Sequence, residues 1–208
     1  MPAFYNNWEN SLHERSFLIK ICVTIPVLIL GLIFLTQFFT FIEYRPGVVL
    51  PDPLLNAIKP VNLTWFIFLF TYGSVLFGIL TIVSKPKLVL TVLHAYMIIL
   101  LFRVICLYFT PLEPPVGIIP LHDIMIEDSF YSGRMNLKDL FFSGHTAAIM
   151  LFFFAAESKR IKAIILILTF IVVFGLLMQH VHYTIDIIAA PFFSWISFKL
   201  AKHINLLA

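Results

Sequence analysis

Long apolar runs separated by short polar connections make up most of the 208-residue chain. Six runs are long enough for a helix to cross a hydrocarbon core about 30 Å thick, which takes roughly 20 residues. They cover Phe17–Thr40, Val61–Val83, Leu88–Thr110, Leu137–Ala156, Ile161–Gln179 and Tyr183–Ala201. Backbone groups in lipid need partners within their own segment, and these runs are too long for barrel strands. The pattern predicts an all-α integral membrane protein, a single bundle of six transmembrane helices over residues 1–208.

Composition supports a membrane setting. Hydrophobic residues make up 61% of the chain and charged residues 12%, whereas about a quarter of the residues of a soluble domain are charged. The first run ends in the polar stretch Glu43–Pro46 without a small-residue cleavage site, so we expect a retained span and not a signal peptide. The preceding segment, Pro2–Glu14, is compatible with a short helix on the inner surface or with a frayed tail.

The distribution of Lys and Arg predicts the orientation. The two termini and the second-to-third and fourth-to-fifth connections hold Arg15, Lys20, Lys85, Lys87, Lys159, Arg160, Lys162, Lys199 and Lys202, and the other connections hold Arg45, Lys59, Arg134 and Lys138. Lys and Arg accumulate in cytoplasmic connections, so we expect both termini in the cytoplasm. The sequence has no basic cluster or basic–aromatic stripe, which argues against nucleic acid as a partner.

Residues with candidate chemistry gather on the outward side of this arrangement. Positions four apart share a helix face, so Asp186 is predicted to accept the Nδ1 proton of His182 and to leave Nε2 unprotonated. Such an imidazole can attack phosphorus while a second histidine, His145, handles the leaving-group proton. The pattern therefore predicts a two-histidine phosphoryl-transfer site. It calls for no cofactor, and Cys22 and Cys106 fall on opposite sides, so neither a metal site nor a disulfide is expected.

Other positions are candidates for binding phosphate. Ser143 and Gly144 open the fourth run, where helix N-terminal amides can bind an anion. Arg103 is the one Lys or Arg well inside a span, and its guanidinium could hold two phosphate oxygens or snorkel to the interface. Asp139 could belong to the site or cap the fourth helix, and Asp52 could act there or be a turn residue between prolines.

One more carboxylate is a candidate for the same site. Glu127 lies in the connection between the third and fourth runs, which would pass over the histidines. We therefore name it as an additional acidic residue near the site.

Four stretches carry a resemblance to a known family: Pro51-Asp52-Pro53, the segment from Arg103 through Tyr108 to Pro111, the segment Asp139–Thr146, and His182-Tyr183-Thr184-Ile185-Asp186. They resemble the type 2 phosphatidic-acid phosphatase (PAP2) superfamily, and within it the sphingomyelin synthases and their ceramide phosphoethanolamine and inositol phosphorylceramide relatives. The resemblance implies a PAP2-like bundle and a catalytic triad of His145, His182 and Asp186. It also implies that His182 is transiently phosphorylated, and it adds Asp139, Tyr108 and Tyr183 to the candidate substrate-binding residues.

The resemblance implies a lipid phosphotransferase. Such an enzyme passes phosphocholine, phosphoethanolamine or a similar headgroup from a glycerophospholipid to a ceramide-like or other lipid acceptor. Diacylglycerol is left, and water can replace the acceptor in a phospholipase C-like reaction. Its partners would be these membrane lipids, and a homo-oligomer is compatible with the sequence.

Two alternatives remain from the sequence. One is a lipid phosphatase acting on phosphatidate or a polyprenyl diphosphate. Arg103, Thr110 and Leu176 stand where such phosphatases carry a lysine and two arginines, which favours the synthase-like reading. The other is a non-catalytic channel, transporter or scaffold, although a single intramembrane arginine and no internal repeat argue against a transporter.

Overall fold

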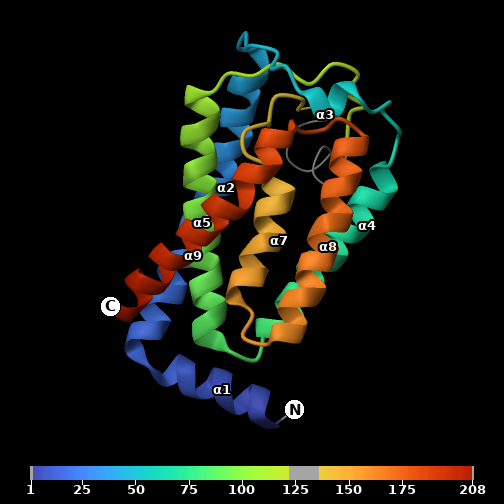
Figure 1. Cartoon of the computed structure of the whole chain (residues 1–208). Coiled ribbons are helices and arrows are strands. Elements are labelled where there is room, and N and C mark those ends of the chain that lie inside the picture. The colour runs from blue at the N-terminus through green and yellow to red at the C-terminus, as the bar shows by residue number, and fades with distance from the viewer. Residues whose placement is uncertain (1, 122–135, 208) are drawn as a thin grey trace.

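The computed structural model describes residues 2–121 and 136–207, and within these ranges it is helical with no β-strand. Figure 1 shows the helices as a bundle, with α1 lying across one end and the short α3 at the other. The helices are α1 (Pro2–His13), α2 (Arg15–Tyr44), α3 (Pro53–Asn56), α4 (Thr64–Ile82), α5 (Pro86–Phe109), α7 (Gly144–Ala155), α8 (Lys159–Met178) and α9 (Thr184–Leu207). By length and composition α2, α4, α5, α8 and α9 can each cross a membrane. The chain is therefore an all-α, multi-pass integral membrane protein.

The fourth predicted span, Leu137–Ala156, is wrong in its first part. Helix α7 has 12 residues and begins only at Gly144, so it is about 18 Å long at 1.5 Å per residue and shorter than the hydrocarbon core. The amides of Leu137 and Lys138 donate to Glu43 Oε2 at 2.9 and 3.1 Å, which holds this part of the chain against the end of α2. The other five spans agree with the observed helices to within a few residues.

Helix α9 holds the centre of the bundle together. It packs against α5 and α7, while α8 packs against α4 and α7 and α2 packs against α5. Figure 1 shows the first turn of α7 deeper in the bundle than the neighbouring ends of α5 and α8. The start of α7 is thus enclosed by other helices, the setting in which non-helical backbone is tolerated at membrane depth.

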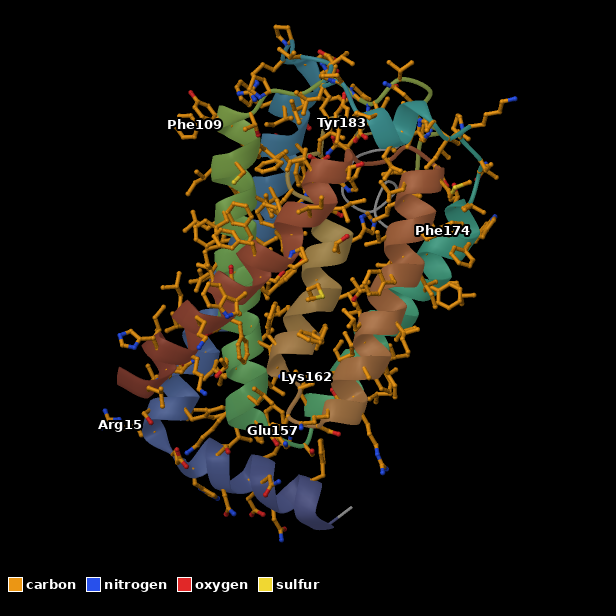
Figure 2. All side chains as sticks on the ribbon, viewed as in Figure 1. Arg15, Phe109, Glu157, Lys162, Phe174 and Tyr183 are labelled. Atoms are coloured by element: carbon orange, nitrogen blue, oxygen red, sulfur yellow. The ribbon has the colours of Figure 1, made fainter. Side chains whose placement is uncertain are left out.

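The N-terminal helix is attached to the end of the bundle opposite α3. Trp8 Nε1 donates to the carbonyl of Val83 at 2.8 Å, and Asn7 Nδ2 donates to the carbonyl of Ser84 at 3.0 Å. Figure 2 shows Arg15 at this end and Tyr183 at the other. The N-terminal segment therefore forms a helix and not a frayed tail.

Two glycines allow neighbouring helices to approach closely. A Cβ on Gly78 of α4 would lie 2.3 Å from Cγ of Phe152 in α7, and a Cβ on Gly175 of α8 would lie 2.7 Å from Cγ1 of Ile67 in α4. Small residues at such contacts let helices in membranes pack backbone to side chain.

Replacing Gly78 with Ala tests this packing. The added methyl group has no room beside Phe152, so we expect the free energy of unfolding in detergent to fall by about 1–3 kcal/mol. Gly73→Ala is the matched control, because no atom lies within 4 Å of its Cβ position in the same helix. An equal loss of thermal stability in both variants would contradict the account.

Candidate active site

Two separate parts of the chain meet where α7 and α9 begin. The backbone amide of Ser143 donates to the carbonyl of Asp186 at 3.1 Å. Next to this bond, the rings of His145 and His182 lie edge to face, with centroids 6.2 Å apart and planes at 67°. The structure thus brings together the two histidines that the sequence proposed as a pair.

The contact between His182 and Asp186 differs from the prediction. Helix α9 begins at Thr184, so His182 lies before it. The prediction that His182 and Asp186 share a helix face is therefore wrong. The two side chains still approach, with His182 Nδ1 3.5 Å from Asp186 Oδ2. Nδ1 of His182 and Oδ1 of Asp186 have no hydrogen-bond partner among the described residues. Catalytic hydrogen bonds are often long outside the reacting complex, so this geometry is compatible with the predicted role.

The carboxylate of Asp186 also binds the backbone of the loop that precedes α9. Its Oδ2 accepts the amide of Tyr183 at 3.0 Å, and the side chain is fully buried. A carboxylate in the first turn of a helix is stabilised by the N-terminal amides and the helix dipole. Asp186 therefore fixes the backbone next to His182 as well as facing its ring.

Arg103 is paired within the protein. Its guanidinium donates to Asp139 Oδ1 and to the carbonyl of Phe142. The side chain of Arg103 is 6% exposed and that of Asp139 is 30% exposed. Asp139 therefore does not cap α7, and Arg103 does not snorkel to the interface.

Gly144 is needed beside this pair. A Cβ at this position would lie 2.7 Å from Nη1 and 2.9 Å from Cζ of Arg103. The guanidinium therefore occupies the space that any other residue would fill with its side chain. Gly144 and Arg103 belong to the site together, although the sequence suggested only an anion-binding helix end.

Ser143 has a structural part in the site. It is the N-cap of α7, its Oγ accepts the amide of Thr146 at 3.4 Å, and the residue is fully buried. The cap does not use the backbone amides of Gly144 and His145. These first-turn donors could bind an anion. Ser143 is a phosphate-binding candidate from the sequence, and its hydroxyl is engaged in the helix cap.

The structure does not bring the two tyrosines to the histidines as substrate ligands. Tyr183 is buried, its hydroxyl donates to the carbonyl of Glu113 at 2.9 Å, and it accepts the amide of Leu50 at 3.1 Å. Tyr108 is half exposed, and its ring lies 5.6 Å from Cζ of Arg45. Both side chains contact residues of other segments at the α3 end of the bundle. Glu127 lies outside the described residues.

An apolar cavity extends from the site into the bundle. It has a volume of about 580 Å³ and is lined by residues of α2, α4, α5 and α7. Arg103 and Asp139 are the charged residues among its described lining, and His145 lies beside them. The lining continues along α5 to Val89, which is about 21 Å from Arg103 at 1.5 Å per residue. The sequence carried no signal for this cavity, because its walls come from four separate helices.

Asp52 is more closely connected to the site than its position between prolines suggested. Its Oδ2 accepts the amide of Thr184 at 2.7 Å, and its Oδ1 accepts the Thr184 hydroxyl at 3.0 Å. Burial alone would raise the pKa of Asp52, but the hydrogen bonds from Thr184, Leu55 and Leu54 outweigh burial and lower the pKa below its ordinary value. The carboxylate of Asp52 therefore lies against the start of α9.

A double-mutant cycle tests the pairing of Arg103 with Asp139. Removing one partner leaves the other charge uncompensated, whereas removing both does not. We expect Arg103→Met and Asp139→Leu each to lower thermal stability, with a coupling of about 1–3 kcal/mol in the double variant. Simple addition of the two losses would show that the two side chains do not depend on each other.

The family comparison covers the part of the chain that holds both histidines. Residues 138–204 match the family model described as PAP2 superfamily C-terminal. No curated protein matches the chain. The matched segment contains α7, α8 and most of α9, and therefore His145, His182 and Asp186. This segment is therefore similar to the PAP2 superfamily, whose members are phosphatases and phosphotransferases.

Proposed function

We propose that the chain is a membrane lipid phosphotransferase of the sphingomyelin synthase type. It moves a phospho-headgroup from a glycerophospholipid to the hydroxyl of a ceramide-like or other lipid acceptor. The observation that carries the proposal is that His145, whose ring lies 6.2 Å from that of His182, lines an apolar cavity together with Arg103 and Asp139.

The reaction follows from the two histidines. Nε2 of His182 attacks the phosphorus, and the bond from phosphorus to the glycerol oxygen breaks. His145 gives that oxygen a proton, which releases diacylglycerol and leaves a phosphohistidine. His145 then removes the proton of the acceptor hydroxyl, whose oxygen attacks phosphorus and frees His182. Asp186 holds the Nδ1 proton of His182 throughout.

The charge of the site favours a phosphodiester with a cationic headgroup. Arg103 is compensated by Asp139, so the described cavity lining has no net charge. A phosphate monoester brings about two negative charges, and a lining without net charge would compensate neither of them. A zwitterionic headgroup can place its phosphate toward Arg103 and its amine toward Asp139, whose carboxylate is partly exposed.

The cavity favours a lipid over a soluble substrate. Its walls are apolar below the charged end and run about 21 Å along α5. Apolar surface of this kind is buried by a long acyl chain, which gains roughly 0.8 kcal/mol per buried methylene group. The acyl chain would hold the headgroup phosphate at the level of the histidines.

The site faces the exterior, periplasm or organelle lumen in this proposal. The Lys and Arg count assigns both termini to the cytoplasm. Arg15 and Lys162 lie at the end of the bundle opposite Tyr183 (Figure 2), in agreement with that count.

Product analysis with purified protein tests the proposal. With a labelled phosphatidylcholine or phosphatidylethanolamine and ceramide, we expect diacylglycerol and a phosphorylated ceramide product. His182→Ala should lower the rate by at least about a hundredfold, because it removes the nucleophile. His203→Ala is the control, since this exposed histidine lies near the C-terminal end of α9.

The products distinguish the competing functions. Free phosphate from phosphatidate or a polyprenyl diphosphate, with no diacylglycerol from a phosphodiester, would replace the proposal with the lipid phosphatase. No product from any of these lipids would overturn an enzymatic function.

Narrowing the cavity tests its role as the acyl-chain site. Ala148 lines it one helical turn after His145. We expect Ala148→Phe to raise KM for a long-chain phospholipid by about tenfold and to have little effect on a short-chain one, because only the long chain loses its buried surface. Phe174→Ala is the control, because Phe174 is 57% exposed on the outside of α8. Equal changes for both chain lengths would contradict this role.

A further inference from the structure

One buried carboxylate joins two loops that are far apart in the sequence. Asp52 is 8% exposed and precedes α3, where its Oδ1 accepts the amides of Leu54 and Leu55 at 3.1 and 3.2 Å. The same carboxylate binds the amide and the hydroxyl of Thr184, the first residue of α9. Asp52 therefore caps α3 through its own loop and α9 from outside.

The cap on α9 lies directly beside the candidate catalytic pair. Thr184 is two residues after His182 and two residues before Asp186. The first amides of a helix have no partner within it, so a carboxylate that binds them fixes where the helix begins. Asp52 is the side chain that fixes the start of α9 between these two residues.

The start of α9 in turn fixes the start of α7. The carbonyl of Asp186 accepts the amide of Ser143, which is the N-cap of α7 and precedes His145 by two residues. Asp52 is therefore connected to the helix that carries His145 by its bonds to Thr184, the first turn of α9, and the bond between Asp186 and Ser143.

We propose that Asp52 is a positioning residue of the active site, which sets the geometry of His182, Asp186 and His145 by capping α9 from the loop before α3. This inference rests on the proposed function for its kinetic consequences. It predicts that loss of the cap lowers the rate of the chemical step more than it lowers substrate binding. A misplacement of about 1 Å at a reacting centre can cost about a hundredfold in rate.

A plain turn residue would act differently. Asp52 in that role would need only its bonds to Leu54 and Leu55, and its loss would destabilise the α3 loop alone. The two bonds to Thr184 distinguish the roles, because they leave the loop and reach α9.

Three variants separate the two sets of bonds. Asp52→Asn keeps one acceptor oxygen and replaces the other with a donor, so it cannot accept both the Thr184 amide and the α3 amides. Thr184→Val removes only the hydroxyl bond, and Thr184→Ser keeps it. We expect kcat to fall by about 10- to 100-fold in Asp52→Asn and by about threefold in Thr184→Val, with KM within about twofold and Thr184→Ser close to wild type.

Asn62→Ala is the matched control. Asn62 Oδ1 accepts the amide of Thr64 at 3.1 Å, so this variant also loses a cap bond, but at the start of α4. It should lower thermal stability without changing kcat. An equal loss of kcat in Asn62→Ala and Asp52→Asn, or an unchanged kcat in Asp52→Asn, would overturn the proposal.

Hydrogen exchange tests the same inference without any substrate. Amide exchange measured by mass spectrometry should quicken in the peptide covering residues 182–187 of Asp52→Asn and stay unchanged there in Asn62→Ala. Unchanged exchange in both would overturn the positioning role even if the enzyme is active. Faster exchange in a protein that turns over none of the lipids would keep the cap and refute the proposed function instead.

Discussion

Backbone groups that leave a helix inside this apolar bundle need a hydrogen-bond partner, and several of its polar side chains serve that need. Glu43 accepts the amides of the segment before α7, and Asp52 and Asp186 accept those at the start of α9. Gln179 is fully buried and does the same for the loop before α4, accepting the amide of Leu63 at 2.8 Å. The candidate active site lies where three of these side chains hold non-helical backbone between the helix ends.

The same constraint governs charge. Arg103 is buried among apolar helices, and its guanidinium is compensated by Asp139 and the carbonyl of Phe142. Gly144 leaves the space that this arrangement requires. A neutral pair beside two histidines is a different environment for phosphate than a cluster of unpaired cations. Because a buried arginine needs a carboxylate partner, this site has no excess positive charge for a phosphate monoester. The burial of Arg103 therefore favours the proposed transferase over a phosphatase.

Much of the fold could be predicted from the sequence, because apolar length alone identifies helices that cross a membrane. Five spans follow from such runs, and the approach of His145 to His182 is expected from their positions at span ends. The sequence leaves the N-terminal segment open between a helix and a frayed tail. The late start of α7 could not be predicted, because the segment before it donates to Glu43, a residue about a hundred positions earlier. The bonds of Asp52 to Thr184 are equally remote in sequence, and a single sequence gives no signal for them. The two tyrosines matched a motif, but their hydroxyl and ring contacts with distant loops are tertiary.

The central claim is that His182 carries the phospho-headgroup between donor and acceptor. The most direct measurement is to mix the protein with phosphatidylcholine in the absence of acceptor, stop the reaction under alkaline denaturing conditions, and map covalent adducts by mass spectrometry. The account predicts an adduct with the mass of the phospho-headgroup on His182 that disappears when ceramide is added before the quench. An adduct on another residue, or product formation with no adduct at His182, would contradict it.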